Sequence, residues 1–364
     1  MHGMTSRRLS PVSYGLGPDI DIDIEQAAAL LEAGGLLAFP TETVYGLGAD
    51  AENPQAVANI YLAKGRPSDH PVIVHLAPEA DLHDWAEAIP PQAWQLAAAF
   101  WPGPLTLILK RARHVPDAVS GGQDTVGLRC PSHPVAQALL RAFKGGKGGV
   151  AAPSANRFGN VSPTTAAHVR DEFGIDASGV DPAGLIAAVL DGGQSAVGIE
   201  STILDLSRMA THGPVLLRPG HISAAQIALV IGQLPTSADA GAPRASGTLE
   251  AHYAPNTAVA MQASSLLAGT LAALLAKGCK VALIHHSVIP HSSQPQADCL
   301  SVHLPAQPEP YAYALYAALR AMDQAGADLI LIEAPPSDAQ WNGINDRLRR
   351  AAHASTGVLQ QFLS

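Results

Sequence analysis

The sequence has few cysteines and no long apolar run, and each shortage excludes a class of protein. Its 364 residues include only three cysteines, which are scattered and form no CxxC pair. Neither a disulfide framework nor a zinc–thiolate site is therefore expected. The N-terminus lacks the apolar core of a secretory signal, and no stretch of about 18 apolar residues is present to span a membrane. We expect a protein of the reducing cytoplasm.

The chain also has fewer positively charged residues than negatively charged ones. The chain has 22 Lys and Arg residues against 31 Asp and Glu, a formal net charge of −9. This balance argues against tight binding to nucleic acid or to anionic lipid through bulk positive charge. A small basic pocket remains compatible with it. Hydrophobic residues make up 47% of the chain but aromatic residues only 5%, so sizeable cores of Ala, Val, Leu and Ile are expected.

Short apolar strands alternate with helices from residue 20 onward. Gly35–Phe39 predicts a buried strand, and Asn53-Pro54 predicts the start of a helix that ends near Lys64-Gly65. Because strict alternation of strand and helix is absent, we expect an α/β domain with a large, twisted, mixed sheet over residues 20–232. Further strands are predicted over residues 72–76, 105–109, 126–130, 150–152, 187–190, 201–206 and 215–218.

The rest of the chain divides into three parts. Residues 233–256 are small, polar and contain Pro and Gly, as is typical of a linker. Residues 257–364 show a cleaner alternation that predicts a smaller, doubly wound (Rossmann-like) C-terminal α/β domain. Residues 1–19 are expected to be a loose N-terminal lead.

Common catalytic and metal-binding motifs are missing from the sequence. It contains no GxxxxGK[ST], GxGxxG, HExxH or GxSxG pattern. The glycine-rich segment at residues 144–149 has the wrong spacing for a phosphate loop and favours a turn. His285, His286 and His291 lack companion carboxylates at ligand spacing, so a solvated loop is favoured over a metal site.

Four segments place polar residues after predicted strands or helices, and the strand ends are where α/β proteins bind ligands. They are FPTETVYGLG (39–48), KGRP (64–67), APSAN (152–156) and GIEST (198–202), the last followed by LRPG (217–220). Taken alone, each also fits a capped turn, cations at a helix C-terminus or an Asx turn. Glu42 and Glu200 are candidate general bases, but acceptance of backbone N–H bonds in a turn is the favoured interpretation.

These segments, followed by SGTLEAHYAP at residues 246–255, resemble the threonylcarbamoyl-AMP synthases in their two-domain form with a YrdC-like catalytic domain. The resemblance is strong over about residues 20–255, and beyond them it rests on position and α/β pattern. It implies a YrdC-like twisted mixed sheet and a nucleotidyltransferase, L-threonylcarbamoyladenylate synthase. Such an enzyme joins L-threonine, bicarbonate and ATP into threonylcarbamoyl-AMP and pyrophosphate. A downstream threonylcarbamoyl transferase complex then modifies tRNA beside the anticodon.

The resemblance also implies roles for individual residues. The catalytic residues by similarity are Lys64, Arg66, Ser154 and Asn156. The threonine-binding residues are Thr43, His75, Arg129, Ala152 and Ser201. The ATP-binding residues are Arg66, His70, Thr125, Ser154, Ser162, Arg218 and Tyr253. His70 departs from the short polar residue of many relatives. Mg²⁺ is expected with ATP, held mainly by phosphate and water, because no carboxylate cluster is evident.

The residue types suit this chemistry. An arginine such as Arg66 offers a planar fork for phosphate oxygens, and Arg129 is a natural partner for a substrate carboxylate. The linker is expected to act as a lid that places Tyr253 over ATP and excludes water.

Two alternative functions remain. One is a carbamoyl-adenylate-forming enzyme of hydrogenase maturation, which would need further domains. The other is an RNA-binding module, which the acidic net charge disfavours.

Overall fold

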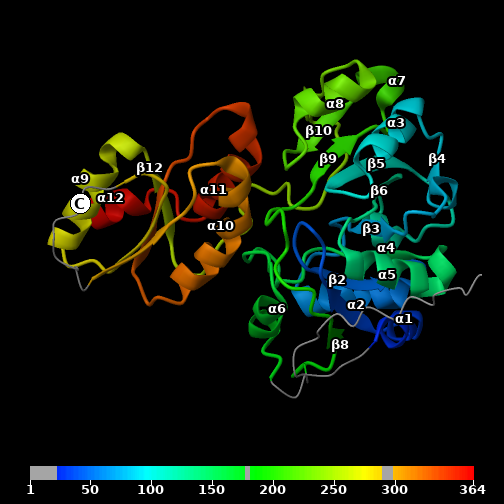
Figure 1. Ribbon diagram of the computed structural model, residues 1–364, viewed down its shortest axis with the longest axis horizontal. Coiled ribbons are helices and arrows are strands. Elements are labelled where there is room, and N and C mark those ends of the chain that lie inside the picture. The colour runs from blue at the N-terminus through cyan, green and yellow to red at the C-terminus, as the bar shows by residue number, and fades with distance from the viewer. Residues whose placement is uncertain (1–22, 177–180, 289–297) are drawn as a thin grey trace, which may run out of the picture.

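The computed structural model describes residues 23–176, 181–288 and 298–364, which form two α/β units (Figure 1). The larger unit is built on an 11-stranded mixed sheet and the smaller one on a four-stranded parallel sheet. This arrangement confirms the predicted fold class. Residues 1–19, predicted to be a loose lead, lie outside the described residues, as does His291.

The strand order in the large sheet is β11-β10-β9-β5-β6-β3-β7-β2-β1-β8, and β4 pairs with β5. The parallel pair β3 and β6 brings His75 and Arg129 directly opposite each other near the middle of the sheet. The strands are β1 (Leu36–Phe39), β2 (Gly46–Asp50), β3 (Ile73–Leu76), β4 (Ala86–Glu87), β5 (Leu105–Arg111), β6 (Thr125–Arg129), β7 (Gly149–Ala151), β8 (Ile186–Val189), β9 (Thr202–Asp205), β10 (Val215–Arg218) and β11 (Thr236–Ser237).

Helix α2 begins and ends where the local sequence predicts. In α2, the Asn53 side chain accepts hydrogen bonds from the first-turn amides, and Gly65 ends the helix in the left-handed conformation at φ 61°. The helices are α1 (Ile24–Glu32), α2 (Pro54–Lys64), α3 (Pro91–Phe100), α4 (Asp117–Ser120), α5 (Pro134–Ala142), α6 (Ala166–Phe173), α7 (Met209–His212) and α8 (Ala224–Ile231). Short 3₁₀ turns occur at Leu82–Asp84 and Phe143–Gly146.

The smaller unit has the strand order β12-β15-β13-β14, with all pairs parallel. Its elements are β12 (Val259–Gln262), α9 (Ser264–Ala276), β13 (Val281–His285), β14 (Cys299–His303), α10 (Pro308–Asp323), β15 (Leu329–Glu333), a 3₁₀ turn at Ala339–Trp341, α11 (Asn342–His353) and α12 (Val358–Leu363). Helices α9 and α12 cover one face, and α10 and α11 cover the other face, toward the large unit (Figure 1). Helices on both faces make this the predicted doubly wound domain.

Three strands of the large sheet, β2, β4 and β11, were not predicted by the sequence. Residues 46–50 follow the polar FPTETVY segment and contain two glycines, which suggested only a turn, yet they form β2 between β1 and β7. The predicted linker contains β11, which pairs in parallel with the edge strand β10. The linker is therefore attached to the large sheet at its start.

The two units share an apolar core. Val44, Val161, Ile199 and Tyr253 of the large unit and linker pack in one cluster with residues of α10 and α11, including Leu315 and Ile344. Burying apolar surface stabilises such a contact, and this cluster lies directly under the polar segments that the sequence singled out. Among the described residues, no helix has the length and apolar character needed to span a membrane.

Candidate active site

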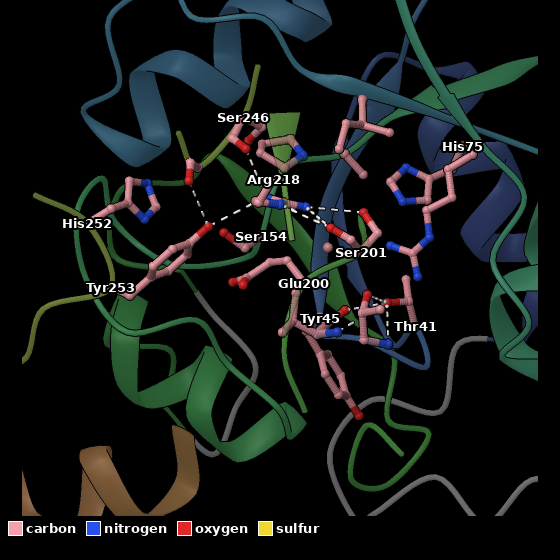
Figure 2. A pocket seen from close by; sticks show the side chains of 18 residues that line it. Thr41, Tyr45, His75, Ser154, Glu200, Ser201, Arg218, Ser246, His252 and Tyr253 are labelled. Atoms are coloured by element: carbon pink, nitrogen blue, oxygen red, sulfur yellow. Dashed lines mark hydrogen bonds between the residues drawn. The ribbon is translucent and has the colours of Figure 1, made fainter. Parts of the chain in front are cut away.

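The polar segments meet around one cavity of about 440 Å³ on the large unit, where the linker crosses it (Figure 2). Strand ends and turns that are far apart in the sequence supply its walls. Eight residues with predicted roles line it: Thr43, His75, Arg129, Ala152, Ser154, Ser201, Arg218 and Tyr253. The remaining predicted residues lie outside its lining, and their assigned contacts with substrate stay predictions.

His75 and Arg129 form one end of the cavity. The guanidinium Nη2 of Arg129 lies 2.8 Å from Oε1 of Glu42, and both side chains are buried. The other carboxylate oxygen of Glu42 accepts a hydrogen bond from the Ser132 amide, 3.1 Å away. Burial and the nearby Arg129 lower the pKa of His75 to about 3, so its imidazole is neutral at pH 7. This end therefore presents one cation beside a neutral ring.

Two hydroxyl groups fix the turn between β1 and β2 at this end. The Thr41 hydroxyl donates to the Val44 carbonyl at 2.6 Å and lies 2.9 Å from the Thr43 hydroxyl. Side-chain hydrogen bonds of this kind replace the backbone pairing that a turn lacks. The Thr43 side chain is thereby held at the cavity wall.

Arg218 lies at the opposite end of the cavity (Figure 2). Its Nε and Nη2 donate to the Ser201 carbonyl at 3.0 and 2.9 Å, and Nη2 also reaches the Ser201 hydroxyl at 3.1 Å. Its Nη1 donates to the Ser246 carbonyl at 2.8 Å and approaches the Tyr253 hydroxyl at 3.5 Å. All five N–H donors of the guanidinium therefore have protein acceptors. Two of these acceptors belong to the linker.

Tyr253 lies under Arg218 in an uncommon backbone conformation. Its φ is 62°, in the left-handed region that residues with a side chain rarely adopt. Its ring is 1% exposed, and its hydroxyl reaches the Gly247 carbonyl at 3.4 Å. Burial raises the pKa of the phenol, so it stays protonated and can donate.

Glu200 joins this end to the C-terminal unit. Its carboxylate accepts hydrogen bonds from the hydroxyls of Ser162 at 2.5 Å and Tyr316 at 2.9 Å, and from Nε of Arg347 at 2.7 Å. Burial alone would raise its pKa, but the guanidinium groups of Arg347 and Arg218 hold that pKa below its usual value. The favoured interpretation, acceptance of backbone N–H bonds in a turn, is therefore wrong for Glu200, because its partners are side chains. For Glu42 the bond from the Ser132 amide fits that interpretation.

The sequence analysis missed the contributions of Arg347 and Tyr316. Both come from the C-terminal unit, more than 100 residues from Glu200. One local signal was available for Arg347. It lies on the apolar face of α11 with Ile344 and Leu348, at helical spacing. A charged residue on a buried face needs a partner, and this one is completely buried and also donates to the Pro219 carbonyl.

Lys64 and Asn156 hold the loop that carries Ser154. The ammonium group of Lys64 donates to the Ser154 carbonyl at 2.6 Å and also to the Asn156 carbonyl. The Asn156 amide donates to the carbonyls of Arg157 and Asn160 at 2.7 and 2.9 Å. Burial, and then the nearby Arg66, lower the pKa of Lys64 well below its ordinary value. In this conformation both side chains bind the loop rather than line the cavity.

Arg66 and His70 lie beside the aromatic ring of Phe158. The guanidinium of Arg66 is 5.7 Å from the ring centroid and donates to the Pro71 carbonyl at 2.9 Å. The His70 ring packs edge-on at 5.4 Å. Burial lowers the pKa of Arg66 to about 10, while burial and Arg66 lower that of His70. Phe158 gave no signal in the sequence as a partner for the Arg66 cation or for the His70 ring.

Two predicted ATP-binding residues lie elsewhere around the site. Thr125 opens β6 and pairs with Lys110, four residues along the strand from Arg129. Ser162 is completely buried and donates its hydroxyl proton to Glu200. Neither contact contradicts a role with ATP, and neither tests it.

Comparison with known proteins identifies the family. Residues 29–220 match the family model described as "Telomere recombination", and residues 222–353 match that of the C-terminal domain of threonylcarbamoyl-AMP synthase. The chain is 38% identical to a threonylcarbamoyl-AMP synthase of Pyrococcus abyssi, covering 90% of this chain and 94% of that one. It is 41% identical to one of Bacillus subtilis, covering 91% and 93%.

Solved structures agree with this result. The fold is similar to that of P. abyssi Sua5 in complex with L-threonine, with a TM-score of 0.78 and 36% identity, covering 92% of this chain and 96% of that one. A variant of the same protein with a histidine and a tyrosine replaced by alanine gives a TM-score of 0.77 at 36% identity, covering 90% and 92%. Both sequence units are matched in order and nearly in full, so this chain belongs to the threonylcarbamoyl-AMP synthase family in its two-domain form.

Proposed function

We propose that this chain is a nucleotidyltransferase that forms threonylcarbamoyl-AMP and pyrophosphate from L-threonine, bicarbonate and ATP. The observation that carries the proposal is the cavity itself. It brings an arginine suited to a carboxylate, Arg129, into one enclosure with the hydroxyl groups and the second arginine, Arg218, that suit a nucleotide.

The chemistry asks mainly for positioning and for stabilisation of negative charge. The neutral amine of threonine forms a C–N bond to the carbon of bicarbonate with loss of water, or to that of carbon dioxide with loss of a proton, and becomes an N-carboxy carbamate. A carbamate oxygen then attacks the α-phosphorus of ATP, an O–P bond forms, and the bond to the β-phosphate breaks to release pyrophosphate. Charge accumulates on carbamate and phosphates together, so fixed cations and hydroxyl donors lower the barrier.

Individual side chains suit these steps. Arg129 would hold the threonine carboxylate, and the hydroxyls of Thr43 and Ser201 would orient its amine and side chain. Arg218 and Arg66 would bind the phosphate groups, and the buried Lys64 would keep the Ser154 loop in place. The cavity wall and linker would exclude water from a labile carbamate and from the mixed anhydride product.

Magnesium would enter as part of the ATP substrate. Within residues 23–176, 181–288 and 298–364 there is no group of three or more His, Cys, Asp or Glu side chains able to hold a metal ion. The two glutamates nearest the cavity, Glu42 and Glu200, are already paired with arginines. The donor set therefore fits Mg²⁺ carried by phosphate oxygens and water, and does not fit a resident metal.

We propose that the product passes to a transferase complex that modifies tRNA beside the anticodon in the cytoplasm, without tight tRNA binding by this chain. The net charge of −9 supports that last point. The linker would act as the lid of the cavity, since Tyr253 and the backbone of Ser246 and Gly247 already line it.

Pyrophosphate release tests the proposal. The complete mixture contains ATP, Mg²⁺, L-threonine and bicarbonate, and each component is omitted in turn. We expect release to require both threonine and bicarbonate. Release that ignores threonine would assign a different acceptor, and a salt-sensitive affinity for tRNA without any ATP turnover would favour an RNA-binding role instead.

A further inference from the structure

Glu42 has an unexplained position beside the active site. Its carboxylate is buried, with 8% of the side chain exposed, and it lies 2.8 Å from Arg129. Arg129 lines the cavity, whereas Glu42 does not. The glutamate therefore contacts the arginine without itself lining the space that a substrate would fill.

This position argues against two simple roles. A general base has to reach the proton that it removes, directly or through one water, and Glu42 is screened from the cavity by a guanidinium. A purely structural carboxylate would direct both oxygens at the turn. Only Oε2 does so, through the Ser132 amide, while Oε1 faces Arg129.

The arginine is held at two points but keeps donors unused. Its Nε lies 3.4 Å from the Gly103 carbonyl, and its Nη2 lies beside Glu42. The contact with Glu42 is a close ion pair without the alignment of a hydrogen bond, so Nη2 has no well-aligned acceptor among the described residues. The side chain is only 5% exposed. A buried guanidinium with unused N–H groups at a cavity wall is suited to an incoming carboxylate.

We propose that Glu42 is a positioning residue, which fixes the guanidinium of Arg129 so that the pocket selects amino-acid substrates by their α-carboxylate. The identity of that amino acid as threonine rests on the proposed function. Two anchors on one side of the guanidinium prevent its rotation, and the remaining N–H groups then define where the carboxylate, and with it the reacting amine, must lie. Glu42 itself touches no substrate.

The test compares two substrates in two variants. The substrates are L-threonine and L-threoninamide, which differ only in the carboxylate, and the readout is the ratio of their kcat/KM values in pyrophosphate release. In Glu42→Gln the amide oxygen can still accept from Ser132, but the charge that anchors Arg129 is lost. We expect the ratio to fall by about tenfold or more, because a misoriented cation distinguishes the two substrates poorly. The KM for ATP should stay unchanged.

Asp205→Asn is the matched control. Asp205 is also fully buried and paired with an arginine, Arg208, at 3.2 Å, but it lies outside the cavity lining. In the Asp205→Asn variant, the ratio of the kcat/KM values for L-threonine and L-threoninamide should equal that of the wild type. If Glu42→Gln fails to fold, Glu42→Asp replaces it. That variant keeps the charge but draws it back by one methylene, and an intermediate ratio is expected.

The outcomes separate this inference from the proposed function. Wild-type protein without threonine-dependent pyrophosphate release would overturn the proposed function, whatever the variants do. Wild-type protein with such release, together with an unchanged substrate ratio in a folded Glu42 variant, would overturn only the role of Glu42. A merely structural glutamate would lower thermal stability and leave the ratio alone.

Discussion

The two ends of the cavity are built from different parts of the chain. The end with His75 and Arg129 comes entirely from the large sheet and its turns. The other end is completed by Tyr253 from the linker and, through Glu200, by Arg347 from the C-terminal unit. The end with Arg129 can therefore form when the large unit folds, whereas the end with Arg218 is complete only when all three parts of the chain have met.

The two arginines of the cavity, Arg129 and Arg218, also differ in how fully the protein satisfies their N–H groups. The Nη2 group of Arg129 has no well-aligned acceptor among the described residues, although it lies 2.8 Å from the Glu42 carboxylate. Arg218 has an acceptor for every N–H, two of them on the linker. If Arg218 binds phosphate as proposed, the phosphate would have to compete with these protein acceptors, including the two on the linker.

The largest effect should follow from breaking the link between the units. Arg347→Ala would leave the carboxylate of Glu200 buried without its main cation, and removal of one partner of a buried ion pair typically costs about 3–5 kcal/mol. We expect a large loss of thermal stability and of ATP-dependent turnover. L-Threonine binding, measured by calorimetry on protein that is still folded, should weaken less than ATP-dependent turnover, since Arg129 lies at the other end and only Ser201 among the predicted threonine contacts adjoins Glu200.

Arg349→Ala is the control for this variant. Arg349 lies on the same helix and pairs with the same Asp346 that Arg347 contacts, but its side chain is 72% exposed. Its removal should have little effect. Equal losses of threonine and ATP affinity in Arg347→Ala would show that the two ends are not independent.

A smaller effect should come from Arg66, which lies beside Phe158 and outside the cavity lining. Arg66→Ala removes a guanidinium that would bind phosphate, and charge-assisted hydrogen bonds contribute roughly 1.5–3 kcal/mol each. Pyrophosphate release should fall by an order of magnitude or more while threonine affinity is kept. Arg157→Ala, an exposed arginine on the neighbouring loop that packs on Phe173, is the control. Undiminished release by folded Arg66→Ala protein would remove Arg66 from the site.

Acid should lower the free energy of unfolding through one buried histidine at each end of the cavity. The pKa of His75 and that of His252 are both lowered to about 3, chiefly by burial, against about 6.5 in an unfolded chain. Between these values the unfolded state binds more protons, so the free energy of unfolding falls as the pH falls. Each histidine should contribute about 1.4 kcal/mol per pH unit below about 6.5.

Single substitutions separate these two contributions. Denaturant unfolding at pH 7 and pH 5 should show a shallower pH dependence in His75→Gln and in His252→Gln than in the wild type. An unaltered slope in either variant would mean that its histidine is protonated in the folded protein. A change in only one variant would show that acid distinguishes the two ends.

Local sequence signals predicted most of the fold because they act over short distances. The Asn53 cap, the Gly65 stop and the apolar runs of β1 and β13 are readable from neighbouring residues. β2 was not predicted because its two glycines and small residues resemble a turn. Only its pairing with β1 and β7 makes it a strand.

As with the fold, local sequence signals predicted part of the candidate site and not the contacts made by distant residues. Motif resemblance named eight of the residues that line the cavity, including Arg129 and Arg218. It could not name the partners of Glu200, because Glu200 and Arg347 are separated by 147 positions and no local signal shows that the two meet. The pairing depends on how the C-terminal unit packs, which is a tertiary property. The roles of His70 and Thr125 toward ATP remain predictions.

The left-handed backbone of Tyr253 has a consequence for the proposed lid. A residue with a side chain costs roughly 1–2 kcal/mol in this conformation. The ring contacts that hold it there are those with Arg218 and with Arg347, whose guanidinium lies 5.4 Å from the ring centroid. If the linker acts as the proposed lid, its closed form stores this backbone strain, and breaking the contacts of Tyr253 with Arg218 and Arg347 would release it.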